Sequence, residues 1–221
     1  MLKYDIHEDF QKMNYTIPVS GTMFAISHLP LKIMLSCTKV PSTIMVQKFK
    51  VKGYRGKPVS LEMYSPRNLA PDMPAMVYFH GGAFGFKASP AHKKLACIYA
   101  ERANCRVIFP DYHLLPNYPY PVAKEDVYAV YQLAIEKSDE LAINPQKVAI
   151  GGDSAGGTLA TYVCKLADEN HIQLPCFQML IYPAVDATMQ TKSMKNFTDT
   201  PIWNSKENKK YGGCICKTVK D

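Results

Sequence analysis

One serine in the sequence has the surroundings of a catalytic nucleophile. Ser154 lies in the segment Gly-Asp-Ser-Ala-Gly at 152–156, which fits the pattern Gly-x-Ser-x-Gly. A serine hydroxyl attacks an ester efficiently only when a general base takes its proton and hydrogen-bond donors stabilise the oxyanion that forms. The pattern alone is weak, since a chain of this length contains one by chance roughly one time in fifteen. The rest of the sequence therefore decides its meaning.

The glycine-rich turn has four competing explanations. A phosphate-binding loop is disfavoured, because Gly157 stands where that motif needs a lysine, although Gly151, Gly156 and Thr158 have its spacing. The Gly-x-Gly-x-x-Gly fingerprint of dinucleotide binding does not fit the segment. Chymotrypsin-like proteases also place Asp before and Gly after the reactive serine, but on all-β barrels. A plain strand–helix turn capped by Ser154 stays open when the turn is considered by itself.

A second glycine cluster supplies what an acyl-transfer site needs. The segment His80-Gly81-Gly82-Ala83 ends the apolar run 75–80 and continues beyond it. Glycines there let backbone N–H groups converge on one point, where they stabilise an oxyanion; loss of one such donor costs about 2.7–4 kcal/mol. In hydrolases with this serine motif, the oxyanion hole joins the N–H after the serine to one from the loop after the third strand. The run 75–80 is the third predicted strand.

Strand-like and helix-like segments alternate around these two motifs. The stretches 44–51 and 59–65 alternate apolar with polar residues and predict an antiparallel pair. Further strands are predicted at 75–80, 105–110, 147–152 and 177–183, with helices at 91–103, at 122–137 and directly after Ser154. This order predicts an α/β fold with a mostly parallel sheet and helices on both faces.

The pattern fades after Pro183. Residues 184–221 predict neither a strong strand nor an amphipathic helix, and 211–221 shows no core face. The strand at 177–183 is therefore the last one predicted. Its outer edge is apolar and uncovered, so we expect the chain to self-associate through it.

Three segments in the same order and spacing resemble the hormone-sensitive-lipase-like esterases of the α/β-hydrolase fold. They are HGGAFGF at 80–86, PDYHLLPNYPYPVAKEDV at 110–127 and GDSAGG at 152–157. The resemblance covers about Pro58 to Pro201 and includes FTDTPIWN at 197–204. It implies an α/β-hydrolase fold with an N-terminal helical cap at 1–43 that helps to form the acyl pocket, an incomplete core at 44–210 and an atypical tail at 211–221. It also implies that the last two strands of the fold are missing.

The resemblance assigns roles to individual residues. It implies that Ser154 is the nucleophile and that His80 shapes the oxyanion loop instead of acting as a base. It places the oxyanion hole at the backbone N–H groups of Gly81, Gly82, Ala83 and Ala155. The family usually has a glycine where Ala83 stands, so its methyl group narrows the site and penalises a positive φ.

The catalytic acid and base are missing from the expected places. In this fold they follow the nucleophile in the order Asp or Glu, then His. The only histidine after Ser154 is His171, which falls roughly 25 Å away at the far end of the predicted helix. Two carboxylates after the serine, Asp186 and Asp199, have no histidine after them. His92 and His113 precede Ser154, and use of either as the base would break the family's geometry.

These observations predict a truncated esterase. By resemblance, the activity is that of a serine carboxylesterase or acetyl-esterase acting on small-molecule esters with short to medium acyl groups through an acyl-enzyme. Loss of the acid and base cripples this activity in the present chain. The alternative is a non-catalytic module that binds a small molecule on an esterase scaffold.

Composition excludes several other classes of function. The 221 residues carry a formal net charge of +7, of which +4 lies in 191–221, and no basic stripe is interleaved with aromatic residues, so a nucleic-acid partner is not expected. The stretch 17–36 is long enough to cross a bilayer but contains two prolines, His28 and Lys32, so we expect it to lie on the protein and predict no membrane partner.

The cysteines predict neither disulfides nor a metal site. There are seven, an odd number, and most lie in apolar stretches. The pair Cys214 and Cys216 has no second ligand pair at the spacing of a zinc finger. No metal or organic cofactor is implied, and a reducing cytoplasm is the simplest location.

Overall fold

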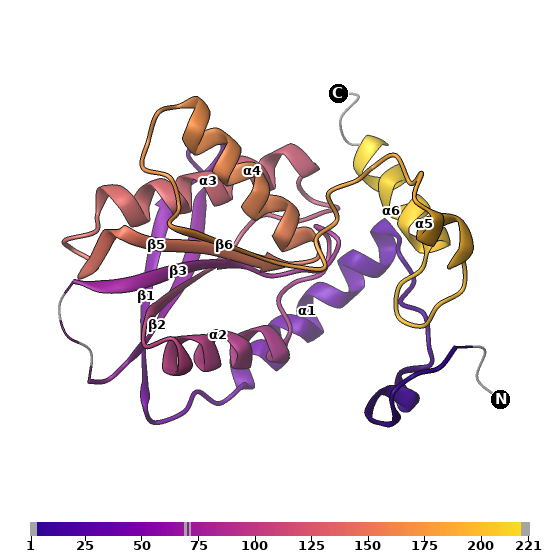
Figure 1. The fold of residues 1–221 in the computed structure, drawn as a ribbon, viewed down its shortest axis with the longest axis horizontal. Helices are drawn as coiled ribbons and strands as arrows, with labels where there is room; N and C mark the ends of the chain where they lie inside the picture. The colour runs from indigo at the N-terminus through magenta and orange to yellow at the C-terminus, as the bar shows by residue number, and fades with distance from the viewer. Residues whose placement is uncertain (1–3, 69, 71, 218–221) are drawn as a thin grey trace.

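A six-stranded sheet organises the chain, with its strands in the order β1-β2-β4-β3-β5-β6 (Figure 1). The computed structural model describes residues 4–68, 70 and 72–217. The sheet strands are β1 (Ile44–Lys52), β2 (Pro58–Pro66), β3 (Met73–Phe79), β4 (Arg106–Asp111), β5 (Ile143–Asp153) and β6 (Phe177–Ile181). The short helical turn η2 (Tyr54–Gly56) joins β1 to β2.

Strand directions confirm the predicted α/β architecture. Strands β1 and β2 form an antiparallel hairpin, and β2 is also antiparallel to β4. Strand β3 is parallel to both β4 and β5, and β5 is parallel to β6. The carboxyl ends of β3 and β5, which carry the two glycine motifs, therefore lie side by side at one edge of the sheet.

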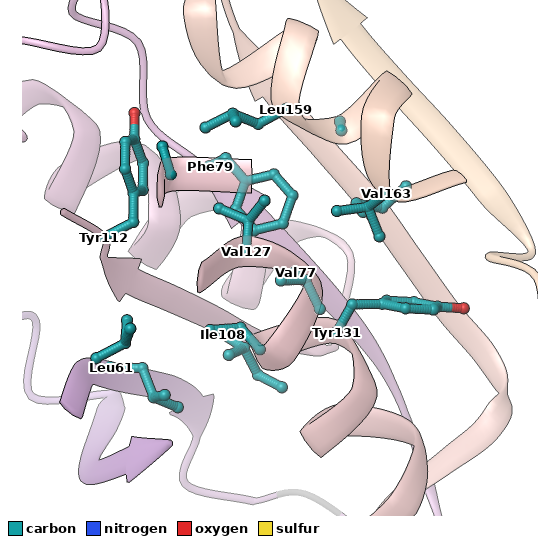
Figure 2. Packing of buried hydrophobic residues seen from close by; sticks show 14 of the residues in the cluster. Leu61, Val77, Phe79, Ile108, Tyr112, Val127, Tyr131, Leu159 and Val163 are labelled. Carbon is teal, nitrogen blue, oxygen red and sulfur yellow. The ribbon is translucent and has the colours of Figure 1, made fainter. Parts of the chain in front are cut away.

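Helices cover both faces of the sheet (Figure 1). Helices α3 (Tyr120–Glu136) and α4 (Ala155–Glu169) lie on one face, and α2 (Pro90–Arg102) lies on the other, with α1 (Gly21–Cys37) beside α2. Each face has its own apolar cluster. Figure 2 shows the α3/α4 side, where Val77, Phe79 and Ile108 of the central strands pack beneath Val127 and Val163. This packing fixes the ends of β3 and β5 against the helices that follow them.

The segment before β1 is helical. It contains the turn η1 (Glu8–Met13) and α1, whose first turn is capped by Ser20 Oγ, which accepts the Met23 N–H at 3.2 Å. Helix α1 continues through Pro30, although a proline in a helix interior usually kinks or ends the helix. A proline removes only one helical hydrogen bond, and the freed carbonyl belongs to Ile26, an exposed residue. No helix in the described ranges is long and apolar enough to cross a bilayer.

The segment after β6 contains two helices that the sequence did not predict, α5 (Lys192–Asn196) and α6 (Ser205–Lys217). Asn204 Oδ1 accepts the Glu207 N–H at 3.1 Å and so caps α6, while Glu207 Oε2 accepts the Val19 N–H at 3.1 Å. Tyr211 is buried against the core, contrary to the expectation for 211–221. Contacts with the N-terminal segment thus stabilise a helix whose composition is largely polar.

The close approach of β3 to α4 generates a stability prediction. A Cβ at Gly156 would lie 2.0 Å from the carbonyl oxygen of Phe79, so Gly156→Ala must displace backbone. We expect Gly156→Ala to lower the free energy of unfolding by about 3 kcal/mol or more, measured by urea denaturation. Gly212→Ala is the matched control, because nothing lies within 4 Å of its Cβ in α6. Equal unfolding midpoints for the two variants would contradict this view of the turn.

Candidate active site

Ser154 occupies a strained turn between β5 and α4. Its backbone has φ 50° and ψ −117°, a conformation that is unfavourable for any residue with a Cβ. It is the residue before the first turn of α4, but its side chain makes no capping hydrogen bond there. The alternative of a plain capping serine therefore fails. Strain at this position is typical of a functional residue.

The neighbouring glycines allow this turn by their lack of a Cβ. A Cβ at Gly152 would lie 2.4 Å from the carbonyl carbon of Gly156, and the Gly156 position is equally closed by Phe79. The Ser154 N–H donates to the carbonyl oxygen of Ile181 at 2.9 Å, which ties the turn to β6. Strands β3, β5 and β6 thus meet at the serine.

The loop after β3 also has an unusual backbone. Gly82, Ala83 and Phe84 have φ values of 123°, 54° and 52°. The penalty expected for the Ala83 methyl group therefore applies, because a residue with a Cβ loses roughly 1–2 kcal/mol in the left-handed region. Hydrogen bonds offset this cost: the Leu115 N–H donates to the Phe84 carbonyl at 2.8 Å, and the Phe86 N–H donates to the Gly82 carbonyl at 2.7 Å.

One of the four predicted oxyanion donors is already engaged. The Gly81 N–H donates to Asp153 Oδ1 at 3.0 Å, so the assignment of Gly81 to the oxyanion hole is wrong. Within the part of the chain that the structure describes, the N–H groups of Gly82, Ala83 and Ala155 have no acceptor. These three remain the predicted oxyanion donors.

Asp153 links the two motifs, a role that the sequence analysis missed. Its buried carboxylate accepts hydrogen bonds from the Tyr78 hydroxyl at 2.8 Å, from the Gly81 N–H and from His92 Nε2 at 3.3 Å. Burial acts to raise the pKa of Asp153, but the hydrogen bonds from His92, Tyr78 and Gly81 outweigh it and lower the pKa. A Cβ at Gly81 would lie 2.3 Å from Asp153 Oδ2. Asp153 therefore requires the glycine that follows His80.

His92 cannot act as the base of Ser154 in this arrangement. Its Nδ1 accepts the Ser89 N–H at 2.9 Å within the capping box of α2. Its other nitrogen, Nε2, donates to Asp153 Oδ2. Both ring nitrogens are therefore engaged in hydrogen bonds.

His80 is fully buried at the start of the loop after β3. Its Nδ1 donates to the Gly81 carbonyl at 2.6 Å, its ring stacks on Tyr112 with centroids 4.5 Å apart, and the Tyr112 hydroxyl donates to the His80 carbonyl at 2.6 Å. Burial, with repulsion from His92, lowers the pKa of His80 to about 4. A neutral, immobilised imidazole supports the predicted loop-shaping role.

The other histidines considered in the sequence are also elsewhere. His113 Nδ1 donates to Asp126 Oδ2 at 2.7 Å, and it lines a surface cleft with His28 and Tyr118 that does not include Ser154. His171 follows α4 at its far end and is exposed. Among the described residues, no histidine hydrogen-bonds to Ser154 Oγ.

No group of three or more His, Cys, Asp or Glu side chains within the described ranges could hold a metal ion. The cysteines with described side chains are free thiols, namely Cys37, Cys97, Cys105, Cys164 and Cys176. Burial raises the pKa of Cys105 to about 11, which keeps this thiol protonated. The Cys214 and Cys216 side chains lie outside the described part of the structure.

Known proteins are similar to this chain in sequence. Residues 76–220 match the family model described as alpha/beta hydrolase fold. Carboxylic ester hydrolase LipN of Mycobacterium tuberculosis is 41% identical over 129 residues, which cover 56% of this chain and 34% of that protein. Carboxylesterase NlhH of the same organism is 32% identical over 151 residues, covering 68% of this chain and 47% of that protein.

A solved structure agrees with these relatives. Bacterial heroin esterase has a TM-score of 0.79 at 25% identity, covering 87% of this chain and 62% of that one. The present chain spans about a third to a half of the length of the curated relatives quoted above. The family model covers more than half of this chain. The chain therefore belongs to the α/β-hydrolase fold family.

Proposed function

We propose that Ser154 is the nucleophile of an acyl-transfer site for small-molecule esters with short to medium acyl groups. The observation that carries this proposal is the strained Ser154 backbone beside a loop whose N–H groups lack acceptors. Relatives named as carboxylic ester hydrolase and carboxylesterase support the reaction class. The N-terminal segment supports its proposed role as a cap, because Phe24 packs on Gly85 of the oxyanion loop.

The proposed chemistry follows from these groups. Ser154 Oγ attacks the ester carbonyl, and the N–H groups of Gly82, Ala83 and Ala155 stabilise the oxyanion. The alcohol leaves and a second attack, by water, releases the acid. Both steps need a base for proton transfer, and none of the described histidines contacts Ser154 Oγ. In a serine protease, loss of the histidine costs on the order of 10⁶ in turnover, so we propose that hydrolysis by this chain alone is slow.

The second candidate function is non-catalytic binding of a small molecule at the same site. It is favoured by the engagement of His92 with Asp153 and of His113 with Asp126, since neither imidazole is free to serve Ser154.

The free thiols support a reducing compartment, and we propose the cytoplasm.

Supplying a base from solution separates the two functions. We expect imidazole in the buffer to accelerate p-nitrophenyl butyrate hydrolysis by the wild-type chain above the solution reaction, and Ser154→Ala to remove that increment. A fluorophosphonate probe should label the wild-type chain and leave Ser154→Ala unlabelled. Saturable binding of the ester without any Ser154-dependent acceleration would favour the binding module.

The Asp153 carboxylate generates a second prediction. Asp153→Asn removes the charge that holds the Gly81 N–H, so hydrogen exchange at Gly81 should accelerate and the probe should label Ser154 on the order of tenfold more slowly. The stability cost should be about 1.5–3 kcal/mol. Because the pKa of Asp153 is lowered by folding, this stabilisation is present at neutral pH and is lost as the pH falls through the folded value.

The control for this variant is Asp168→Asn, on the exposed side of α4. It should leave the Gly81 exchange rate and the labelling rate unchanged. Equal exchange in wild type and Asp153→Asn would show that Asp153 does not hold the loop.

We also propose that the β6 edge pairs two copies of the chain. Phe177 and Tyr182 are 60% and 75% exposed, and residues 172–185 contain no charged side chain to oppose pairing. If β6 of one copy pairs antiparallel with β6 of a second copy, the two copies are related by a twofold axis. We expect a concentration-dependent dimer by light scattering, and Leu180→Lys should dissociate it. Met45→Lys on the opposite edge strand, β1, should not; a wild-type chain that stays monomeric would exclude the pairing.

A further inference from the structure

Helix α1 exposes an apolar face that the proposed chemistry does not use. Ile26, Leu29, Ile33 and Met34 are 65%, 66%, 54% and 53% exposed. Their spacing of three, four and one residues along a helix puts them on one side. Clustered exposure of four large apolar side chains is unusual for a surface that contacts only water, whereas single exposed residues are ordinary.

The same part of the chain is basic. Residues 10–61 contain no Asp or Glu, and they contain eight basic residues: Lys12, Lys32, Lys39, Lys48, Lys50, Lys52, Arg55 and Lys57. The rest of the chain has 18 of the 26 basic residues against all 19 acidic ones. Positive charge is therefore concentrated in two stretches, +8 in residues 10–61 and +4 in residues 191–221, while the remaining residues together carry −5.

Strand geometry places part of this charge on the same face of the sheet as α1. Ile44 and Val46 of β1 belong to the apolar cluster that includes Leu35 of α1. Because successive residues of a strand alternate between faces, Lys48, Lys50 and Lys52 also point to that face. Figure 1 shows α2 covering this side of the sheet, with α1 beside α2. Lys48 lies 3.5 Å from Glu62, while Lys50 and Lys52 make no ion pair with the described residues.

We propose that this surface docks on an anionic lipid membrane, which would replace the sequence-based expectation of no membrane partner. The α1 surface comprises Ile26, Leu29, Lys32, Ile33, Met34, Lys39, Lys50 and Lys52. Its apolar side chains enter the acyl boundary and its lysines pair with headgroups, the combination by which proteins bind reversibly to one leaflet. A second copy of the chain fits this surface poorly, because the eight basic residues of one copy would face and repel the eight of the other. Nucleic acid would leave the apolar face in water.

Docking would place lipid beside the candidate active site. On its inner side, α1 buries Phe24 against Gly85, and His28 Nε2 donates to the Gly85 carbonyl at 2.7 Å. The helix that meets the lipid therefore also contacts the oxyanion loop. This step rests on the proposed function and extends its substrates to apolar esters dissolved in a lipid phase. The docking itself does not need Ser154.

Vesicle co-sedimentation tests the proposal on the whole chain. We expect the protein to bind vesicles of phosphatidylcholine with phosphatidylglycerol, to bind pure phosphatidylcholine much less, and to dissociate as salt is raised. Ser154→Ala should bind equally well. This last measurement keeps docking separate from the hydrolytic function, since either can fail without the other.

Two pairs of variants locate the surface. Lys50→Gln/Lys52→Gln should weaken binding to the anionic vesicles roughly twentyfold, whereas Lys137→Gln/Lys147→Gln removes the same charge outside the basic stretch and should have a small effect. Leu29→Glu/Ile33→Glu should abolish binding, and Leu174→Glu/Val185→Glu, on residues that are also about half exposed, should not. Circular dichroism verifies that each variant is folded.

Three results would overturn the proposal. The first is that the wild-type chain does not bind anionic vesicles. The second is that a variant and its matched control lose vesicle binding equally. The third is that the wild-type chain forms a dimer but does not bind lipid, and that Leu29→Glu/Ile33→Glu dissociates this dimer. The last result would assign the α1 surface to a second copy. The lysine variants change only exposed groups, so the test holds even where the glutamate variants fail to fold.

Discussion

The carbonyl oxygen of Phe79 lies 2.0 Å from the place where a Cβ of residue 156 would be, and the site is built around this approach. It brings the end of β3 against the first turn of α4, closer than any side chain would allow. The backbone of Gly152 closes on the same point. With these atoms in contact, the loop after β3 must leave the sheet directly beside Ser154. The position of Ser154 relative to the loop after β3 is thus set by main-chain contacts, which leave few alternative conformations.

Asp153 holds the second half of this arrangement. Its carboxylate joins the N–H of Gly81, the hydroxyl of Tyr78 and the imidazole of His92, which come from the loop, β3 and α2. A buried carboxylate is costly unless hydrogen bonds replace its hydration, and three donors do so here. The positive φ values of Ala83, Phe84 and Ser154 cost a few kcal/mol together, and they persist because these contacts leave the backbone no relaxed alternative.

The sequence predicts the sheet and its helices because their signals are local. Apolar periodicity marks β1 to β6, and the glycine patterns mark the two motifs. The errors concern elements that distant contacts determine. Helix α6 has an amphipathic pattern but a largely polar composition, and its Glu207 side chain accepts the Val19 N–H from almost the other end of the chain. The role of Gly81 was mistaken because its N–H partner is 72 residues away. The residue before the serine, an aspartate ending a buried strand, was the one local indication of that contact.

Two carboxylate–imidazole pairs hold His92 and His113 away from Ser154. His92 donates to Asp153 with one nitrogen and accepts the Ser89 N–H with the other, so turning it toward Ser154 would leave a buried carboxylate and a helix cap without partners. His113 is held by Asp126, which is fully buried and also accepts the Tyr54 N–H at 3.0 Å. In both pairs the imidazole satisfies a buried charge, and freeing it would cost more than a weak hydrogen bond to a serine hydroxyl returns. An imidazole that serves as a base for Ser154 therefore has to be one that does not already stabilise the fold. Among the described histidines nearest to the two motifs, both His80 and His92 already do so.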